Sequence, residues 1–250
     1  MVSQNCINNY IPSLSGTNML SGFNFVPISG NPASSGVVDW YTCPSGKKAA
    51  VTQINYCSPS GSASITPSLK SGGNYYPLNA VLSADATGVG AAGLLNLIIL
   101  EAGESISTNQ STASINVWIT VIEFDDTVPF KTHKVLALAN GNNTLYTCPS
   151  GKSARFLTTA LSTVNSTSTS NSIAYYNGSG SNRSINAYHV PNGGSVSGSN
   201  ALLSTASTVS NNNILTSTIR SNCMNAGDFL VISTNAATAT QWSWVSVWEI

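Results

Sequence analysis

Five cysteines and two histidines are the residues of this sequence best suited to bind a metal ion or to catalyse a reaction. The cysteines are scattered and include no Cys-x-x-Cys pair, the spacing typical of zinc sites. Neither His133 nor His189 is accompanied by a Gly-x-Ser-x-Gly sequence that would supply a nucleophilic serine. The pattern favours free thiols packed as small apolar side chains, and it predicts no metal site and no catalytic residue.

Two acidic pairs and one glycine-rich segment are the other candidates for chemistry. Glu101 with Glu104, and Asp125 with Asp126, could act as paired carboxylates in glycoside hydrolysis. The first pair flanks a turn and the second lies in a polar break, which are ordinary places for acids. Residues 88–93 match Gly-x-Gly-x-x-Gly, but the preceding segment is polar where a dinucleotide site needs a buried parallel strand. We therefore expect no cofactor and a protein that is not an enzyme.

The composition limits the partners that this chain can have. Charged residues make up only 7%, with nine basic residues balancing nine acidic ones, so no basic surface for nucleic acid is expected. No apolar run approaches the ~20 residues that cross a membrane. The first residues lack the pattern of a signal peptide, so synthesis in the host cytoplasm is expected. A surface of Ser, Thr, Asn and Gly, with little repulsive charge, suits packing against neighbouring proteins.

An internal duplication organises the chain. The heptapeptide Tyr-Thr-Cys-Pro-Ser-Gly-Lys at 41–47 recurs letter for letter at 146–152. Two further matches follow in the same order: residues 102–104 with 226–228, and residues 118–124 with 244–250. The spacing between matches grows along the chain, so the second copy carries longer loops. Two copies of this length indicate tandem domains, because a solenoid needs shorter and more numerous repeats.

Each copy has the pattern of an all-β unit. Short segments rich in β-branched and aromatic residues, such as 48–56 and 115–124, alternate with Pro and Gly turns. Residues 91–100 are compatible with either a helix or a buried strand. The sequence predicts two tandem β-sandwich, jelly-roll-like domains at 23–126 and 127–250, preceded by an N-terminal arm at 1–22.

The closing segments of both copies are apolar on both faces. A half-exposed strand alternates apolar with polar residues, so a second covered face indicates contact with the other domain or another subunit. The alternative is a central strand covered by the loops of its own domain. The candidate interface residues are Val117, Ile119, Val121, Trp242, Trp244 and Trp248.

The repeated motifs resemble those of virion structural proteins of tailed phages. The shared features are the Tyr-Thr-Cys-Pro-Ser-Gly-Lys opening, the Ala-Gly-Glu or Ala-Gly-Asp turn, and a closing strand that begins with Trp118 or Trp244. Cys43 and Cys148 stand where the family usually has Val. The resemblance implies a jelly-roll-like structural module and carries no catalytic residue across.

From these features we expect a capsid decoration (cement) protein on the capsid surface of a virion. It would bind the major capsid protein or other virion proteins, and it would form a homotrimer that reinforces the shell. The alternative is a tail-fibre, baseplate or adhesin module that binds host surface glycans through its tyrosines, with Asn and Ser as hydrogen-bonding partners. The tyrosines available for this role are Tyr75, Tyr76, Tyr175, Tyr176 and Tyr188.

Overall fold

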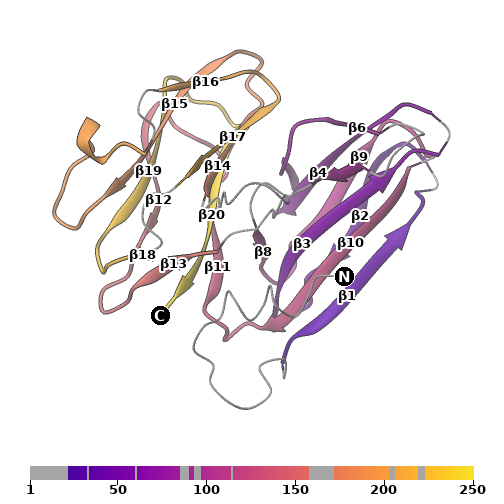
Figure 1. Ribbon diagram of the computed structural model, residues 1–250, viewed down its shortest axis with the longest axis horizontal. Coiled ribbons are helices and arrows are strands. Elements are labelled where there is room, and N and C mark those ends of the chain that lie inside the picture. Colours follow the sequence, from indigo (N-terminus) through magenta and orange to yellow (C-terminus); the bar gives the residue numbers. More distant parts are fainter. Residues whose placement is uncertain are drawn as a thin grey trace, which may run out of the picture.

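Over the residues that it describes, the computed structural model is an all-β protein with four antiparallel sheets, A to D, and one short 3-10 helix, η1 (Gly198–Asn200) (Figure 1). The structure describes residues 22–250, apart from 33, 60, 85–89, 93–96, 114, 158–171, 203–205 and 219–222. The predicted all-β class is confirmed. The predicted N-terminal arm lies outside the described residues, except for Gly22.

Sheets A and B are built from the first half of the chain. Sheet A contains β1 (Asn24–Gly30), β10 (Asn116–Asp125), β3 (Lys47–Cys57) and β7 (Gly90–Ala92) in that order, with β8 (Ile98–Leu100) also paired to β3. Sheet B contains β2 (Gly36–Thr42), β9 (Ser105–Gln110), β4 (Ala63–Ser71) and β5 (Asn74–Pro77), with β6 (Leu82–Ala84) also paired to β4.

Sheets C and D are built from the second half. Sheet C contains β17 (Asn213–Thr218), β14 (Ser172–Asn177), β20 (Gln241–Glu249), β13 (Ala154–Phe156) and β18 (Cys223–Met224), with β11 (Phe130–Val135) also paired to β20. Sheet D contains β12 (Gly141–Thr147), β19 (Phe229–Thr234), β15 (Arg183–Val190) and β16 (Ser207–Val209). In Figure 1 the two groups of strands lie side by side, with β8, β11 and β20 near their meeting line.

Period-two alternation along the strands builds the two cores. In β10, Val117, Ile119 and Val121 are buried in one hydrophobic cluster with residues of sheet B such as Ile65 and Ile106. A second cluster lies between sheets C and D and includes Val245 and Val247 of β20. Each half therefore has the packing of a β-sandwich.

The duplicated heptapeptide forms the same corner in both halves. The backbone N–H of Cys43 donates to Glu104 O at 2.8 Å, and the N–H of Cys148 donates to Asp228 O at 2.9 Å. Gly103 and its counterpart Gly227 both have φ = +83°, a conformation that L side chains rarely adopt. The identical residues are therefore explained by a shared turn geometry.

A tyrosine–glutamate hydrogen bond ties the two sheets of each half together. The Tyr41 hydroxyl of β2 donates to Glu123 Oε1 of β10 at 2.9 Å. The equivalent pair is Tyr146 of β12 and Glu249 of β20, at 3.3 Å. Burial is the main cause that raises the pKa of both tyrosines, and the neighbouring carboxylate adds to it, so both remain neutral donors at physiological pH.

Candidate functional site at the junction of the two halves

The cysteines have structural environments. Cys43 and Cys148 are buried beneath the repeated corners, and their thiols point to the backbone oxygens of Lys47 and Lys152 at 3.3 and 3.5 Å. Burial raises the pKa of the Cys43 thiol to about 11, so it carries no thiolate at neutral pH. Within the described part of the chain, no group of three or more His, Cys, Asp or Glu is placed to hold a metal ion.

Each of the two histidines faces a carboxylate of the repeat. His133 Nε2 lies 3.6 Å from Glu249 Oε1, and its ring packs on Tyr146 with the ring centroids 4.3 Å apart. His189 Nε2 lies 3.4 Å from Asp228 Oδ2. Burial, reinforced by Lys131 and Lys134, lowers the pKa of His133 despite the attraction of Glu249.

The lowered pKa of the half-buried His133 predicts a loss of stability in mild acid. Because the pKa of His133 is lower in the folded chain than in the unfolded one, the unfolded state takes up a proton first as the pH falls below about 6.5. Stability should be full above that pH and should fall as the pH approaches the folded-state pKa. Urea unfolding between pH 8 and pH 5 should show this slope, and His133→Gln should reduce it. An unchanged slope in the variant would contradict the assignment.

One carboxylate of each acidic pair has a structural partner. Lys47 pairs with Asp125 at 2.5 Å, on the exterior. The carboxylate of Glu104 forms an ion pair and hydrogen bonds that are described below. Of the glycine-rich motif, residues 90–92 form strand β7, antiparallel to β3, where a dinucleotide site would need a helix N-terminus. Residues 88, 89 and 93 lie outside the described residues.

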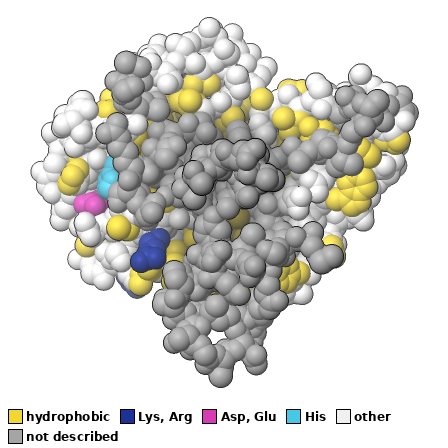
Figure 2. Space-filling view, viewed as in Figure 1, with side chains coloured by type: hydrophobic (Ala, Val, Ile, Leu, Met, Phe, Trp, Pro, Cys, Tyr) yellow, Lys and Arg dark blue, Asp and Glu magenta, His cyan; other side chains and the backbone are white. Residues whose placement is uncertain are grey.

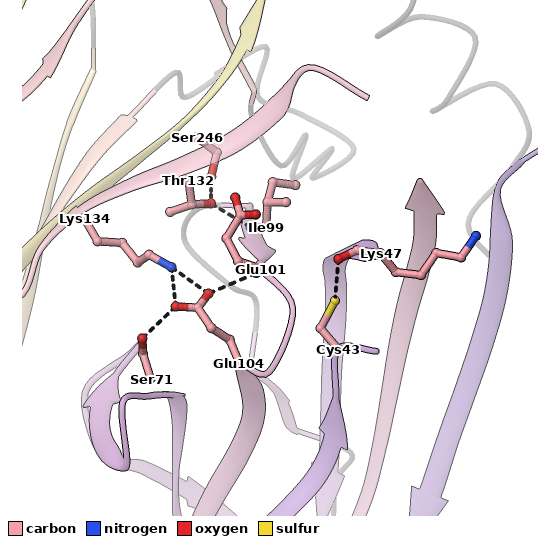
Figure 3. Close-up of polar contacts among 9 residues, drawn as sticks. All are labelled: Cys43, Lys47, Ser71, Ile99, Glu101, Glu104, Thr132, Lys134 and Ser246. Atoms are coloured by element: carbon pink, nitrogen blue, oxygen red, sulfur yellow. Dashed lines mark hydrogen bonds and ion pairs between the residues drawn. The ribbon is translucent and has the colours of Figure 1, made fainter. Parts of the chain in front are cut away.

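A ring of hydrogen bonds joins the two halves, and Figure 3 shows its links from Ile99 to Thr132 and from Thr132 to Ser246. The backbone N–H of Ile99, next to β3, donates to Thr132 Oγ1 of β11 at 2.7 Å, and Ser246 Oγ of β20 donates to Leu97 O at 2.6 Å. The two hydroxyls are 2.6 Å apart. Because the only hydroxyl hydrogen of Ser246 goes to Leu97, Thr132 must be the donor between them. These hydroxyls satisfy backbone groups on β8 and beside it that would otherwise be buried without partners.

A buried ion pair lies beside this ring. Lys134 Nζ of β11 is 2.6 Å from both carboxylate oxygens of Glu104, and only 12% of each side chain is exposed. The same carboxylate accepts from Ser71 Oγ at 2.7 Å and from the backbone N–H of Glu101 at 3.0 Å (Figure 3). Four hydrogen bonds from three donor groups therefore compensate the buried charge.

The ion pair explains a difference between the two copies. In the second copy the equivalent acid, Asp228, accepts the backbone N–H of Asn225 at 2.9 Å, just as Glu104 accepts that of Glu101. Burial alone would raise the pKa of Asp228. Three contacts outweigh burial and hold that pKa low: the hydrogen bonds from the backbone N–H groups of Asn225 and Asn192, and the contact with His189. Because Glu104 has one more methylene than Asp228, its carboxylate can accept the backbone N–H of the turn and contact Lys134 at the same time.

Removing Lys134 should loosen the junction strongly. Lys134→Met leaves the Glu104 carboxylate buried without its cation and should cost about 3 kcal/mol in free energy of unfolding. Adding Glu104→Gln should recover much of that loss, because the uncompensated charge is then gone. Glu104→Asp tests whether the longer side chain is needed for the contact with Lys134, since an aspartate accepts the backbone N–H of the same turn in the second copy. Chemical denaturation of the wild type, Lys134→Met, Glu104→Gln and the double variant measures the coupling, and additive losses would show that the pair contributes nothing.

The first half alone should fold, but with reduced stability. A fragment ending at Asp126 contains every strand of sheets A and B. It lacks Thr132 and Lys134, so the N–H of Ile99 and the carboxylate of Glu104 lose their partners from the second half. We expect a β-rich circular dichroism spectrum and a melting temperature below that of the full chain. A spectrum of a disordered chain would contradict the predicted division at 126/127.

The predicted interface residues fall into two sets. Val117, Ile119 and Val121 are at most 2% exposed inside the first sandwich, so they line an internal core and not a surface open to another subunit. Trp242 and Trp244 belong to that same cluster although they lie on sheet C of the second half. The two faces of β20 are thus covered by sheet D and by the first half.

The tryptophans form the apolar part of the junction. The rings of Trp242 and Trp244 are stacked, with centroids 4.2 Å apart and planes inclined by 16°. Trp242 Nε1 donates to Pro77 O of the first half at 3.0 Å, and its ring packs on Tyr76. Trp248 is half-buried and packs edge-on against Phe130.

The tyrosines expected to bind glycans differ in exposure. Tyr175 is 1% exposed within the second core and is not available to a ligand. Tyr76 and Tyr188 are half-buried, Tyr176 is largely buried at the junction, and Tyr75 is 42% exposed. None of the helices in the described part of the chain is long and apolar enough to span a membrane.

Sequence reasoning missed Thr132, Ser246 and Lys134. Nothing in their spacing separates them from the many Ser, Thr and Lys residues that face solvent. The one signal that could have pointed to Ser246 is its place among tryptophans on one face of the closing strand, where an exposed residue would be unusual.

Comparison with known proteins gives a remote likeness in fold. No protein-family model matches the sequence, and no curated protein matches it. A chain from the atomic structure of the Sulfolobus turreted icosahedral virus is 15% identical, with TM-score 0.23 over 94% of this chain and 61% of that chain. A chain from a study of a triple jelly roll fold and turret assembly in an archaeal virus is also 15% identical, with TM-score 0.23 and 92% and 60% covered.

A third similar structure is the tandem CBM22 domain of Paenibacillus barcinonensis Xyn10C, 8% identical, with TM-score 0.23 and 94% of both chains covered. The present chain spans about 60% of the length of the two viral chains. Likeness at this level concerns the arrangement of strands and assigns no function.

Proposed function

We propose that this protein is a non-enzymatic structural component of a virus particle, which decorates the capsid by binding the major capsid protein. The observation that carries the proposal is the junction. A buried ion pair, a ring of hydrogen bonds and two stacked tryptophans fix the two sandwiches to each other. A protein that bridges neighbouring shell subunits needs two contact areas at a fixed separation. A rigid junction between the two sandwiches keeps that separation fixed.

The low charge of the chain supports the same proposal. Only 7% of residues are charged, and Figure 2 shows few charged side chains among the described atoms on one face of the molecule. Such a surface packs on a neighbour without the cost of desolvating many ions. The resemblance of the repeated corner to virion repeats of tailed phages points in the same direction.

The outer face of sheet A is the surface that we expect to contact the shell. Trp118 and Phe25 are 41% and 42% exposed on adjacent strands of that face, opposite the buried Val117 and Ile119. Exposed aromatic side chains are enriched in the energetically dominant parts of protein interfaces. A trimer at local threefold positions of the shell would present three such faces.

The test is binding to particles and copy number. Purified protein should bind particles that lack it, and Trp118→Asp should abolish binding while leaving the circular dichroism spectrum unchanged. Quantitative mass spectrometry should find hundreds of copies per particle, and light scattering should find a trimer. Absence from purified particles would overturn the proposal. A small multiple of three or six at the tail would favour the tail-fibre or baseplate alternative.

A further inference from the structure

The junction contains a cleft that none of the contacts above explains. It has a volume of about 270 Å³ and lies where the outer face of sheet B meets the second half. Thr66, Ser68 and Asn109 of sheet B contribute to its lining, together with Tyr176 and Asn212 of the second half. It therefore exists only because the two halves are held together.

The floor of the cleft presents polar side chains without partners. Strand pairing places Thr66 directly beside Asn109, and Ser68 directly beside Pro77, all on the same face of sheet B. The hydroxyls of Thr66 and Ser68 and the amide of Asn109 make no side-chain hydrogen bond to any residue that the structure describes. Ser68 is only 5% exposed, so its free hydroxyl faces the cleft and little bulk solvent.

The walls add two aromatic rings and a second amide. Tyr75 is 42% exposed at the rim. On the opposite side, the Tyr176 hydroxyl donates to Asn212 Oδ1 at 3.3 Å, which leaves the Asn212 NH₂ group for a ligand. Asn212 is held in a left-handed conformation, φ = +56°, with its backbone N–H bonded to Asn177 O. Its amide is thus fixed in place before a ligand arrives.

The charges beside the cleft cancel. Lys70 and Asp39 form an ion pair at 2.5 Å, Ser107 Oγ also donates to Asp39, and the Lys70 ammonium lies 5.3 Å from the centroid of the Tyr75 ring. No unpaired charge is therefore offered to an ionic ligand. The backbone groups of β4 are paired to β9 on one side and to β5 and β6 on the other, so β4 itself offers no open strand edge to a peptide.

We propose that this cleft binds a neutral saccharide unit, such as the terminal hexose of a glycan. A pyranose ring combines apolar C–H faces, which pack on aromatic rings, with hydroxyls that both donate and accept hydrogen bonds. The lining matches this combination, with Tyr75 and Tyr176 for the ring faces and the Asn and Ser side chains for the hydroxyls. The volume lies slightly below the usual range of small-molecule pockets, which fits one sugar residue.

The inference goes beyond the proposed role on a capsid and is independent of it. Capsid binding is expected to depend on Trp118, on the outer face of sheet A, whereas saccharide binding depends on sheet B and the second half. An experiment can therefore disprove either proposal without affecting the other.

The test uses the full chain and methyl glycosides of glucose, galactose and mannose as probes at millimolar concentration. Saturation-transfer NMR should show binding of at least one of them. Tyr75→Ala and Asn109→Ala should each weaken that binding about tenfold. Asn212→Gly removes the amide while keeping the left-handed backbone, and it should weaken binding similarly. Trp118→Ala is the control of equal exposure and should leave binding unchanged, with melting temperatures confirming that all variants are folded.

Three results would overturn the proposal. The first is the absence of binding by all of the neutral glycosides. The second is binding that survives Tyr75→Ala, Asn109→Ala and Asn212→Gly together. The third is stronger binding of sialic acid or of a short uncharged peptide than of any neutral glycoside, because the ligand class would then be different.

Discussion

Ile119→Lys should prevent the first half from folding. Ile119 is 2% exposed in the core between sheets A and B, and Ile54 is its neighbour on β3. An ammonium at this depth has no carboxylate to pair with in the apolar cluster, so the cost of burying it should exceed about 5 kcal/mol, which is comparable to the whole stability of a domain. The expected readout is loss of soluble, folded protein by circular dichroism and gel filtration.

Thr120→Lys is the matched control for this prediction. Thr120 is the next residue on β10, is half-buried and points to the outer face of sheet A, where the ammonium can reach water. It should change the free energy of unfolding by less than about 1 kcal/mol. If Ile119→Lys gave a folded monomer from a wild-type oligomer, Val117, Ile119 and Val121 would line a subunit interface and the core assignment would fail.

Trp242→Ala should separate the unfolding of the two halves. In the wild-type chain the two halves share one hydrophobic cluster, so a single calorimetric transition is expected. The alanine variant loses the stacking on Trp244, the contact with Tyr76 and the hydrogen bond to Pro77, at a cost of about 3–5 kcal/mol. Differential scanning calorimetry should then show two transitions, the first at a much lower temperature.

Trp118→Ala removes the same kind of side chain from an exposed position and should leave the calorimetric trace nearly unchanged. Two transitions already present in the wild-type protein would show that the shared cluster does not couple the halves. A single transition in Trp242→Ala, at the wild-type temperature, would show that the tryptophan pair is not essential to the junction.

The shared geometry of the repeated corner could be predicted from the sequence. Two identical heptapeptides at matching places specify identical turns, because Pro, Gly and the buried thiol act on their immediate neighbours. The division of each closing strand into two faces was also readable, since side chains alternate strictly along a strand. Residues 91–100 were ambiguous between helix and strand, and residues 98–100 form β8. A run of apolar residues has no period that distinguishes the two states.

The sequence by itself determined the all-β class, the internal repeat and the apolar character of both faces of the closing strands, because these follow from local turn chemistry and from side-chain period. The expected cover over the second face is present on β20, but the expectation is wrong at Trp118 of β10, which is 41% exposed. Only the tertiary structure decided what covers each face. Val117 meets sheet B of its own half, whereas Trp242 meets the first half, although both are apolar residues on closing strands. The choice depends on the orientation of one sandwich against the other. That orientation is fixed by contacts such as Glu104 with Lys134 and Thr132 with Ser246, whose side chains look like ordinary surface residues until distant segments are brought together.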